Sequence, residues 1–308
     1  MSEILTLGEP LVEFNHQDGM RWLQGYGGDT SNAAIAAARQ GAQSGVIARI
    51  GADAFGDGLM ALWAEEGVST AHVTQDDAAP TGIYFVHHDA DGHRFSYRRS
   101  GSAASVMTPQ DLPVEAIRSA KVLHLSGISL AISSSACDAC FAAMRIAREA
   151  GVKVSLDTNL RTLLWPVDRA RAVIHAAMAF ADIALPGLDD ARALLGVDDP
   201  HAIAARYRAM GPSTVALTLG EAGALVADGD DVATIPSRPA RVVDASGAGD
   251  CFDGAFLARL TQGDSVGAAA HYAAVAASLS VEGYGAIAPV PRREDVLSAL
   301  GEMASSYA

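Results

Sequence analysis

Short apolar runs alternate with Ala-rich segments along most of the chain. Ile4–Leu7 is an apolar run that stops at Gly8, and the Ala-rich segment Asn32–Gln40 stops at Gly41. Short runs between turn residues predict buried strands, and segments that end at glycine predict helices. The predicted strands are Ile4–Leu7, Gly45–Ile50, Val122–Leu125, Lys153–Leu156, Ala181–Leu185, Thr214–Leu219 and Ala224–Val226, and the predicted helices are Asn32–Gln40, Gly58–Glu66, Ser133–Ala150, Gly249–Leu260 and Ala268–Val281.

This alternation predicts an α/β fold in which helices cover both faces of a mainly parallel sheet. Strands that are apolar along their whole length must be buried on both sides. No long linker or repeat divides the 308 residues, so we predict one three-layer α/β/α domain over residues 1–308. Ligands of such sheets bind beyond the carboxyl ends of the strands.

The segment between residues 80 and 104 interrupts the alternation. Gly82–His88 and His93–Arg99 flank an Asp-Ala-Asp-Gly turn, a pattern typical of a β-hairpin. One face of the first strand carries Tyr84, Val86 and His88, and one face of the second carries Phe95, Tyr97 and Arg99. With residues 9–30, the hairpin is expected to form a small β-sheet lid over the ligand end of the large sheet. Its open edges predict a homo-oligomer, a dimer or larger.

Composition and charge exclude several classes of protein. Hydrophobic residues make up 50% and charged residues 19% of the chain, enough for a large core. The net charge of -14 argues against nucleic acid or an anionic membrane surface as the main partner. The apolar stretches are shorter than the ~18 residues of a membrane span, and Glu3, Glu9 and Glu13 interrupt any signal peptide. With an odd number of cysteines, a soluble cytoplasmic protein is expected.

The stretch Val242–Asp250 is the most informative for chemistry, because small residues lead directly into a predicted helix. Small residues let the backbone approach an anion, and the amides and dipole at a helix start stabilise negative charge. Asp250 beside such a site suits a base that takes a proton from a hydroxyl attacking a phosphoryl group. The alternative is an Asp that caps the helix after a Gly-rich turn.

Other nucleotide-binding motifs are excluded. A P-loop needs Gly-Lys-Ser/Thr, but the two lysines of the chain, Lys121 and Lys153, do not follow glycine. The protein-kinase motifs are missing, and a Rossmann fingerprint at Gly247 would need glycine where Phe252 stands. Phosphates bound here would be neutralised by backbone amides, arginines and Mg²⁺.

Two glycine motifs carry a family resemblance. Gly247-Ala248-Gly249-Asp250 after Asp244 resembles the C-terminal motif of the ribokinase-like (PfkB) carbohydrate kinases, and Gly27–Asn32 resembles their N-terminal di-glycine motif. Within this family the chain is most similar to 2-keto-3-deoxygluconate kinases. The segments that carry this likeness are Gly8–Val12, Thr81–Tyr84, Tyr97–Arg99, Gly101–Ala103, Leu125–Ile132, Asp157–Arg161, Leu164–Trp165 and Gly285–Ile287. The resemblance spans nearly the whole chain and implies a ribokinase-like fold.

The resemblance implies roles for the matching residues. Asp250 would be the catalytic base, and the amides of Gly247, Ala248 and Gly249 would form the anion hole for the transferred phosphoryl group. The implied ATP-binding residues are Thr218, Gly220, Gly223, Gly247 and Gly249, and the implied substrate contacts are Gly28, Asn32, Tyr84, Tyr97, Arg99, Arg161 and Asp250. Asp244 and Ser246 match positions that hold a monovalent cation such as K⁺ in some relatives.

The arginines favour an acidic sugar independently of the resemblance. A protein of charge -14 must offer local positive charge to hold a carboxylate, and a guanidinium binds one through two parallel hydrogen bonds. Arg99 on the lid and Arg161 beyond a strand end are suitable. The alternatives are a solvated strand-edge arginine for Arg99, and a phosphate contact or surface ion pair for Arg161.

One stretch departs from the family pattern. Where the family usually carries Asn-x-x-Glu near the phosphates, this chain has Gly187-Leu188-Asp189-Asp190. The Asn amide is lost, and Asp190 has a shorter reach than Glu. We expect Asp190 to order Mg²⁺ through water, since Mg²⁺ usually keeps several waters.

Three further groups of polar residues have simpler interpretations. Cys137, Cys140 and Cys251 are expected to pack in the interior. The histidines His87, His88 and His93 are expected on a wet lid surface, and Asp228–Asp231 is expected to be a hairpin turn rather than a Ca²⁺ loop.

Together these features predict an ATP-dependent kinase that phosphorylates 2-keto-3-deoxy-D-gluconate at its C6 hydroxyl, giving 2-keto-3-deoxy-6-phosphogluconate. Closure of the lid would exclude water, which competes as an acceptor. One alternative is a kinase of the same family that acts on 2-keto-3-deoxygalactonate, fructose or ribose. The other is a non-catalytic sugar or nucleotide sensor built on this fold.

Overall fold

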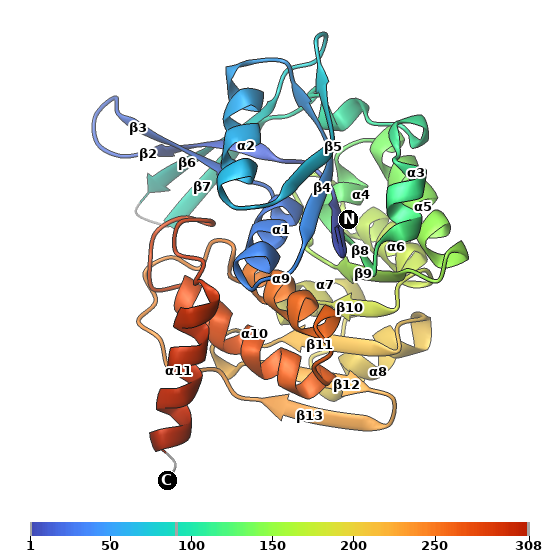
Figure 1. The fold of residues 1–308 in the computed structure, drawn as a ribbon, viewed down its shortest axis with the longest axis vertical. Coiled ribbons are helices and arrows are strands. Elements are labelled where there is room, and N and C mark those ends of the chain that lie inside the picture. The colour runs from blue at the N-terminus through green and yellow to red at the C-terminus, as the bar shows by residue number, and fades with distance from the viewer. Residues whose placement is uncertain (1, 90–91, 307–308) are drawn as a thin grey trace.

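The computed structural model describes residues 2–89 and 92–306, which form a large sheet between helices and a small sheet beside it (Figure 1). Within these residues the large sheet has nine strands, in the order β13 (Asp231–Ile235), β12 (Ala224–Asp228), β11 (Thr214–Thr218), β10 (Ile183–Leu185), β9 (Lys153–Asp157), β8 (Val122–Ser126), β1 (Ile4–Leu7), β4 (Ser44–Gly51) and β5 (Ser69–Asp76). Neighbouring strands from β5 to β11 are parallel, whereas β12 is antiparallel to β11 and β13 is antiparallel to β12.

Helices cover both faces of the large sheet because side chains alternate along its strands. Leu5 and Leu7 of β1 face one helix layer, and Ile4 faces the other. The first layer contains α3 (Val114–Ser119), α4 (Gly127–Ala131), α5 (Ser134–Glu149), α6 (Val167–Met178), α7 (Leu188–Leu195) and α8 (Pro200–Met210). The second contains α1 (Asp29–Arg39), α2 (Ala54–Glu65), α9 (Ala248–Thr261), α10 (Val266–Ser280) and α11 (Arg293–Ser306). This arrangement confirms the predicted three-layer α/β/α fold.

The small sheet, here called the lid, has the order β3 (Trp22–Gly27), β2 (Leu11–His16), β6 (Gly82–Asp89) and β7 (Gly92–Arg98). The strands β2 and β6 are parallel, and each is antiparallel to its outer neighbour. These strands lie within the two segments that were predicted to form a lid. Residues 90–91 of the predicted turn lie outside the described residues, as do the side chains of His88 and His93.

Two helices, α1 and α2, begin about one turn earlier than the apolar pattern predicts. The helix α1 starts at Asp29 because its cap, Gly28, has a φ of 107° that ends the preceding strand. The helix α2 starts at Ala54 because the Asp53 carboxylate accepts hydrogen bonds from the amides of the first turn. The earlier start of α1 places Asp29 in its first turn, at the ligand end of the sheet.

Several elements lack the signal on which the prediction relied. The edge strand β5 is half exposed, so it has no continuous apolar run. The helices α6, α7, α8 and α11 bury only part of their surface and were not predicted. The short 3₁₀ segments η1 (Ala104–Val106), η2 (Pro109–Asp111) and η3 (Gly220–Ala222) connect larger elements.

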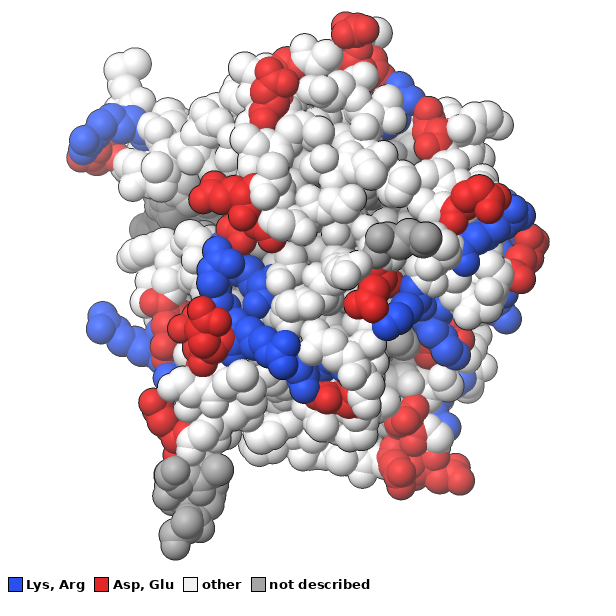
Figure 2. All heavy atoms as spheres, in the orientation of Figure 1, with Lys and Arg blue, Asp and Glu red and all other residues white. Residues whose placement is uncertain are grey.

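Figure 2 shows how charge is distributed over one face of the molecule. On this face Lys and Arg side chains gather in patches that Asp and Glu side chains border. Among the described residues of this face, no basic surface therefore extends without interruption. In the parts of the chain that the structure describes, no helix has the length and apolarity that crossing a membrane requires.

A glycine allows α1 and α9 to approach each other closely. A Cβ atom on Gly254 of α9 would overlap the carbonyl oxygen of Ala33 and would lie 2.7 Å from the Cβ of Ala36, both on α1. The two helices contribute their first turns to the same cavity, described below. Their close packing therefore sets the position of the residues in those turns.

We predict that Gly254→Ala lowers the free energy of unfolding by about 1–3 kcal/mol, because the added methyl group overpacks the contact between α1 and α9. The matched control is Gly267→Ala in α10, where a Cβ atom would meet nothing within 4 Å. That change is expected to raise the free energy of unfolding by about 0.5–1 kcal/mol. Urea unfolding measures both values, and a Gly254→Ala variant as stable as the control would contradict the close packing.

Candidate active site

The loop before α9 is held in place by the carboxylate of Asp244. Its Oδ1 accepts a hydrogen bond from the amide of Ser246 and its Oδ2 accepts one from the amide of Gly285, each at 2.9 Å. Gly247 then caps α9 in the left-handed conformation, with a φ of 74°, and a Cβ atom there would lie 2.8 Å from the carbonyl oxygen of Ala286. Only glycine fits this position, and the loop delivers the start of α9 to the ligand end of the sheet.

Asp250 lies in the first turn of α9. It is not the helix cap, because Gly247 occupies that position and the Asp250 carboxylate accepts a hydrogen bond from Asn32 Nδ2 at 2.8 Å. Burial raises the pKa of Asp250 to about 7 and the nearby Asp29 adds to this effect, whereas Asn32 and Arg161 oppose it. A carboxylate with a pKa near neutrality is well matched to general base catalysis.

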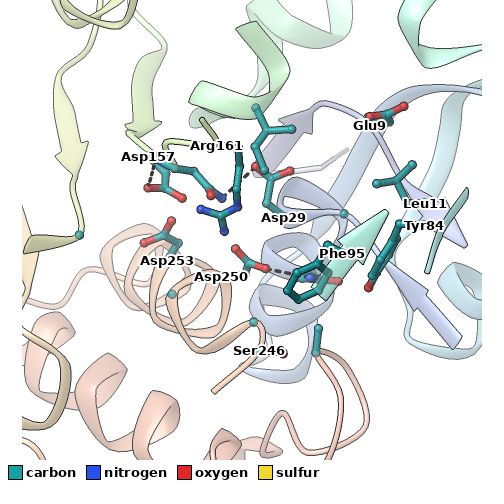
Figure 3. Close-up of a pocket in the computed structure, with 18 of the residues that line it drawn as sticks. Glu9, Leu11, Asp29, Tyr84, Phe95, Asp157, Arg161, Ser246, Asp250 and Asp253 are labelled. Carbon is teal, nitrogen blue, oxygen red and sulfur yellow. Dashed lines mark hydrogen bonds between the residues drawn. The ribbon is translucent and has the colours of Figure 1, made fainter. Parts of the chain in front are cut away.

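Three further carboxylates that sequence analysis did not select lie near Asp250 (Figure 3). They are Asp29 of α1, Asp157 at the end of β9, and Asp253 of α9, and all three line the same cavity. Burial, with repulsion among these carboxylates, raises the pKa values of Asp157 and Asp253 well above their ordinary range. Asp253 follows Asp250 by three residues on one helix, a spacing that could have revealed their shared face.

The loop after β9 brings Arg161 into this group of acids. Asn159 has a φ of 26°, unusual for a residue other than glycine. Its amide donates to Asp157 Oδ1 at 3.0 Å, and its Nδ2 donates to Asp29 Oδ2 at 3.1 Å. Arg161 then points into the space between the carboxylates of Asp157, Asp29 and Asp250 (Figure 3).

The core and the lid enclose a cavity of about 490 Å³, here called the sugar cavity after the substrate contacts that the sequence predicts for it. All seven predicted substrate contacts line it: Gly28, Asn32, Tyr84, Tyr97, Arg99, Arg161 and Asp250. Its lid side is aromatic, because Tyr84 and Tyr97 stack there with ring centroids 6.0 Å apart. The Tyr84 hydroxyl donates a hydrogen bond to Glu13. The cavity therefore combines an aromatic wall with a strongly polar floor.

Arg99 enters the sugar cavity as half of an ion pair. Its side chain is 10% exposed and its guanidinium pairs with Glu9, whose side chain is fully buried. The guanidinium carbon also lies 5.3 Å from the ring centroid of Tyr97. The alternative of a solvated strand-edge arginine is therefore wrong, and the Arg99 guanidinium is paired with a carboxylate within the protein.

A second cavity, of about 770 Å³, lies on the other side of the start of α9 and is here called the nucleotide cavity after the ATP-binding residues that the sequence predicts for it. Of the predicted ATP-binding residues, Thr218, Gly220, Gly223 and Gly249 line it, and Gly247 lines the sugar cavity. Apolar side chains make up much of its wall, among them Val242, Phe252, Ala274, Ala277 and Val281. The two cavities share Thr218, Ala245 and Gly249, so they meet at the first turn of α9.

The residues predicted to hold cations have partly satisfied carboxylates. Asp190 lines the sugar cavity, and its Oδ2 accepts a hydrogen bond from the amide of Leu160 at 2.8 Å. Burial raises the pKa of Asp190. Within the described chain, no three His, Cys, Asp or Glu side chains are grouped to hold a metal ion. Asp190 therefore fits a metal that takes most of its ligands from water and phosphate. A monovalent cation at Asp244 and Ser246 stays a prediction.

Two of the three cysteines pack in the interior as expected, whereas Cys137 is half-buried, and His87 is more buried than predicted. Cys140 and Cys251 are buried, and burial raises the pKa of Cys251 to about 12. Rather than lying on a wet surface, His87 is half-buried, with its ring centroid 5.0 Å from that of Trp22. The pairing of β12 with β13 confirms a hairpin turn within Asp228–Asp231.

Comparisons with known proteins cover nearly the whole chain. The profile described as "pfkB family carbohydrate kinase" matches residues 6–293. The chain is 35% identical to a 2-dehydro-3-deoxygluconokinase of Thermoproteus tenax, over 97% of this chain and 95% of that protein. It is 32% identical to fructokinase-1 of Oryza sativa subsp. japonica, over 96% of each. A fructokinase from Xylella fastidiosa, crystallised with bound ATP, superposes with a TM-score of 0.90 at 25% identity, over 99% of this chain and all of that one.

We predict that Asp253→Asn stabilises the protein by an amount that grows with pH. Burial raises the pKa of Asp253 above the ordinary 3.8, so above about pH 4 the folded state keeps a proton that the unfolded state has lost. Wild-type stability then falls by up to about 1.4 kcal/mol per pH unit until the folded pKa is reached. The Asn side chain does not titrate, so the stability of the variant lacks this pH dependence.

Thermal unfolding at pH 5 and pH 8 measures this effect. The matched control is Asp168→Asn, a change at a side chain that is 94% exposed, for which the difference from wild type should be the same at both pH values. A difference for Asp253→Asn that also stays constant would show that Asp253 is ionised in the fold at both pH values.

Proposed function

The chain belongs to the pfkB family of carbohydrate kinases, and we propose that within it the protein phosphorylates 2-keto-3-deoxy-D-gluconate (2-dehydro-3-deoxygluconate) at C6, with MgATP as the donor. The observation that carries this proposal is the position of Asp250. Its carboxylate lines a sugar-sized cavity at the helix start where that cavity meets a second, nucleotide-sized one. The product would be 2-keto-3-deoxy-6-phosphogluconate.

The residues around Asp250 suit an in-line phosphoryl transfer. Asp250 would accept the proton of the C6 hydroxyl as its oxygen attacks the γ-phosphorus, and Asn32 holds the carboxylate in one orientation. The amides of the first turn of α9 and the helix dipole would stabilise charge on the transferred group. Bound Mg²⁺ would neutralise phosphate charge, and Asp190 would hold it through water.

Arg161 supports an acidic sugar as the substrate. The sugar cavity is lined by seven carboxylates, Glu9, Glu13, Asp29, Asp157, Asp190, Asp250 and Asp253, and by two arginines, Arg99 and Arg161. Because Arg99 is paired with Glu9, Arg161 is the guanidinium better placed to bind a sugar carboxylate. Protonation of Asp157 and Asp253, whose pKa values are raised, reduces the repulsion that such a ligand meets. The likeness to a 2-dehydro-3-deoxygluconokinase points the same way.

Fructose is the second candidate substrate. The similarity to fructokinase-1 of rice is nearly as high as the similarity to the keto-acid kinase, and it covers as much of the chain. A non-catalytic sensor is disfavoured, because Asp250 and the cavity residues around it are all in place.

Asp250→Asn is expected to lower kcat by about 10²–10⁴-fold with little change in the affinity for ATP, because the amide cannot accept the hydroxyl proton. In the wild type, kcat/KM should rise about tenfold per unit up to a pH near 7 and then level off, since only the ionised form of Asp250, with its pKa of about 7, acts as a base. Initial rates of ADP formation from pH 5 to 9 measure both effects. A wild-type rate in the variant, or a profile flat through pH 7, would contradict the assignment.

A sugar panel tests the substrate. The wild type should show a kcat/KM for 2-keto-3-deoxygluconate at least about 100-fold above that for fructose or ribose, the scale of one charge-assisted contact. Arg161→Met should remove most of this preference by raising KM for the keto acid while leaving the fructose value within threefold. Arg118→Met, at a half-exposed arginine on α3, serves as the control. Equal kcat/KM values of the wild type for fructose and the keto acid would eliminate the acid-sugar proposal.

A further inference from the structure

The chain passes between the large sheet and the lid at four places in the described residues. These crossings are residues 8–10, 28, 77–81 and 99–103. Any movement of the lid relative to Asp250 must change the backbone or the contacts at these points. Glu9 lies in the first crossing and contacts residues in or next to the other three.

The carboxylate of Glu9 reaches the last crossing directly. It pairs with Arg99, and its Oε1 accepts a hydrogen bond from Ser102 Oγ at 3.0 Å. Arg99 and Ser102 are the residues by which the chain returns from β7 to the core. Glu9 therefore fastens the entry into the lid to the exit from it.

Glu9 also packs against the second crossing and against the residue that follows the third. A Cβ atom on Gly28 would overlap the carbonyl oxygen of Glu9, and a Cβ atom on Gly82 would lie 3.0 Å from Glu9 Oε1. Gly82 begins β6, directly after the third crossing. The amide of Ala103, in the fourth crossing, donates a hydrogen bond to the carbonyl oxygen of Pro80, in the third, at 2.8 Å. Glu9 therefore contacts the second and fourth crossings and the residue that follows the third.

The ion pair gives this junction a link to the ligand. Arg99 and Glu9 both line the sugar cavity, and the buried Nε of Arg99 has no hydrogen-bond partner. In a buried ion pair, removing one partner leaves the other charge uncompensated, so Arg99 depends on Glu9. Glu9 thus determines where Arg99 stands relative to a bound sugar.

We propose that Glu9 is a positioning residue for sugar binding, which holds Arg99 in the sugar cavity and fastens the four crossings so that lid and core keep one arrangement. This inference rests on the proposed function only in that the protein phosphorylates a sugar, whichever sugar that is. Glu9 would affect sugar binding through Arg99 and would take no part in phosphoryl transfer. Its loss should therefore change KM for the sugar and leave kcat and the KM for ATP nearly unchanged.

A double-mutant cycle of Glu9→Gln and Arg99→Met tests the proposal, with 2-keto-3-deoxygluconate and ATP as substrates. Glu9→Gln alone should raise KM for the sugar at least tenfold, with kcat and the KM for ATP within threefold of wild type. In the Arg99→Met background the same change should alter KM for the sugar less than twofold, because Glu9 acts through Arg99. The double variant, which has no unpaired buried charge, should melt at a higher temperature than either single variant.

The control is Glu66→Gln, which breaks another buried arginine–carboxylate pair, with Arg39, outside the lid and both cavities. It should lower the melting temperature and leave KM for the sugar within twofold of wild type. Should Glu9→Gln not fold, Glu9→Asp in the same cycle keeps the charge, shortens its reach and should raise KM several-fold only when Arg99 is present.

Two results would overturn the proposal. One is an equal rise in KM for the sugar in both backgrounds, which would show a general structural defect, and the other is an unchanged KM in the single variant. The substrate proposal fails separately, if the wild type phosphorylates fructose but not the keto acid. The cycle is then measured with fructose, so the role of Glu9 is tested in either case.

Discussion

The hydrogen bond from Asn32 to Asp250 joins the first turns of α1 and α9, and the rest of the site is arranged around it. These helices come from opposite ends of the chain, and Gly254 lets them pack closely enough for the bond to form. The N-termini of α1, α7 and α9 all line the sugar cavity. Three helix dipoles therefore present their positive ends to one volume, which favours an anionic ligand there.

This arrangement supports the proposal that a protein with a large excess of acidic residues binds acidic ligands. Carboxylates outnumber arginines in the sugar cavity, but burial and mutual repulsion raise the pKa values of Asp157 and Asp253, so their negative charge is reduced. The negative charge of Glu9 is paired with the positive charge of Arg99. In the proposed complex, the positive ends of the helices and Arg161 would hold a carboxylate or a phosphate, and Asp250 would exchange a proton near neutral pH.

The lid has a different physical basis from the core. The core is held by apolar side chains on both faces of the large sheet, whereas the junction between lid and core is centred on the buried charge of Glu9. A buried ion pair is favourable only when its two partners are well placed, and removing either partner leaves an uncompensated charge. Such a junction defines one arrangement of the lid, and it ties that arrangement to a residue of the sugar cavity.

The sequence alone was sufficient for features that depend on neighbouring residues. Apolar runs, glycines and the small residues before Asp250 determine strands, helix ends and an anion site locally, so the α/β fold and the base candidate could be predicted. The half-exposed strand β5 could not, because an edge strand buries too little to leave an apolar run. Only the tertiary structure decided that Asp29, Asp157 and Asp253 converge and that Arg99 is paired with Glu9. Those contacts join residues far apart in the chain, and their charges depend on burial, which local pattern does not encode.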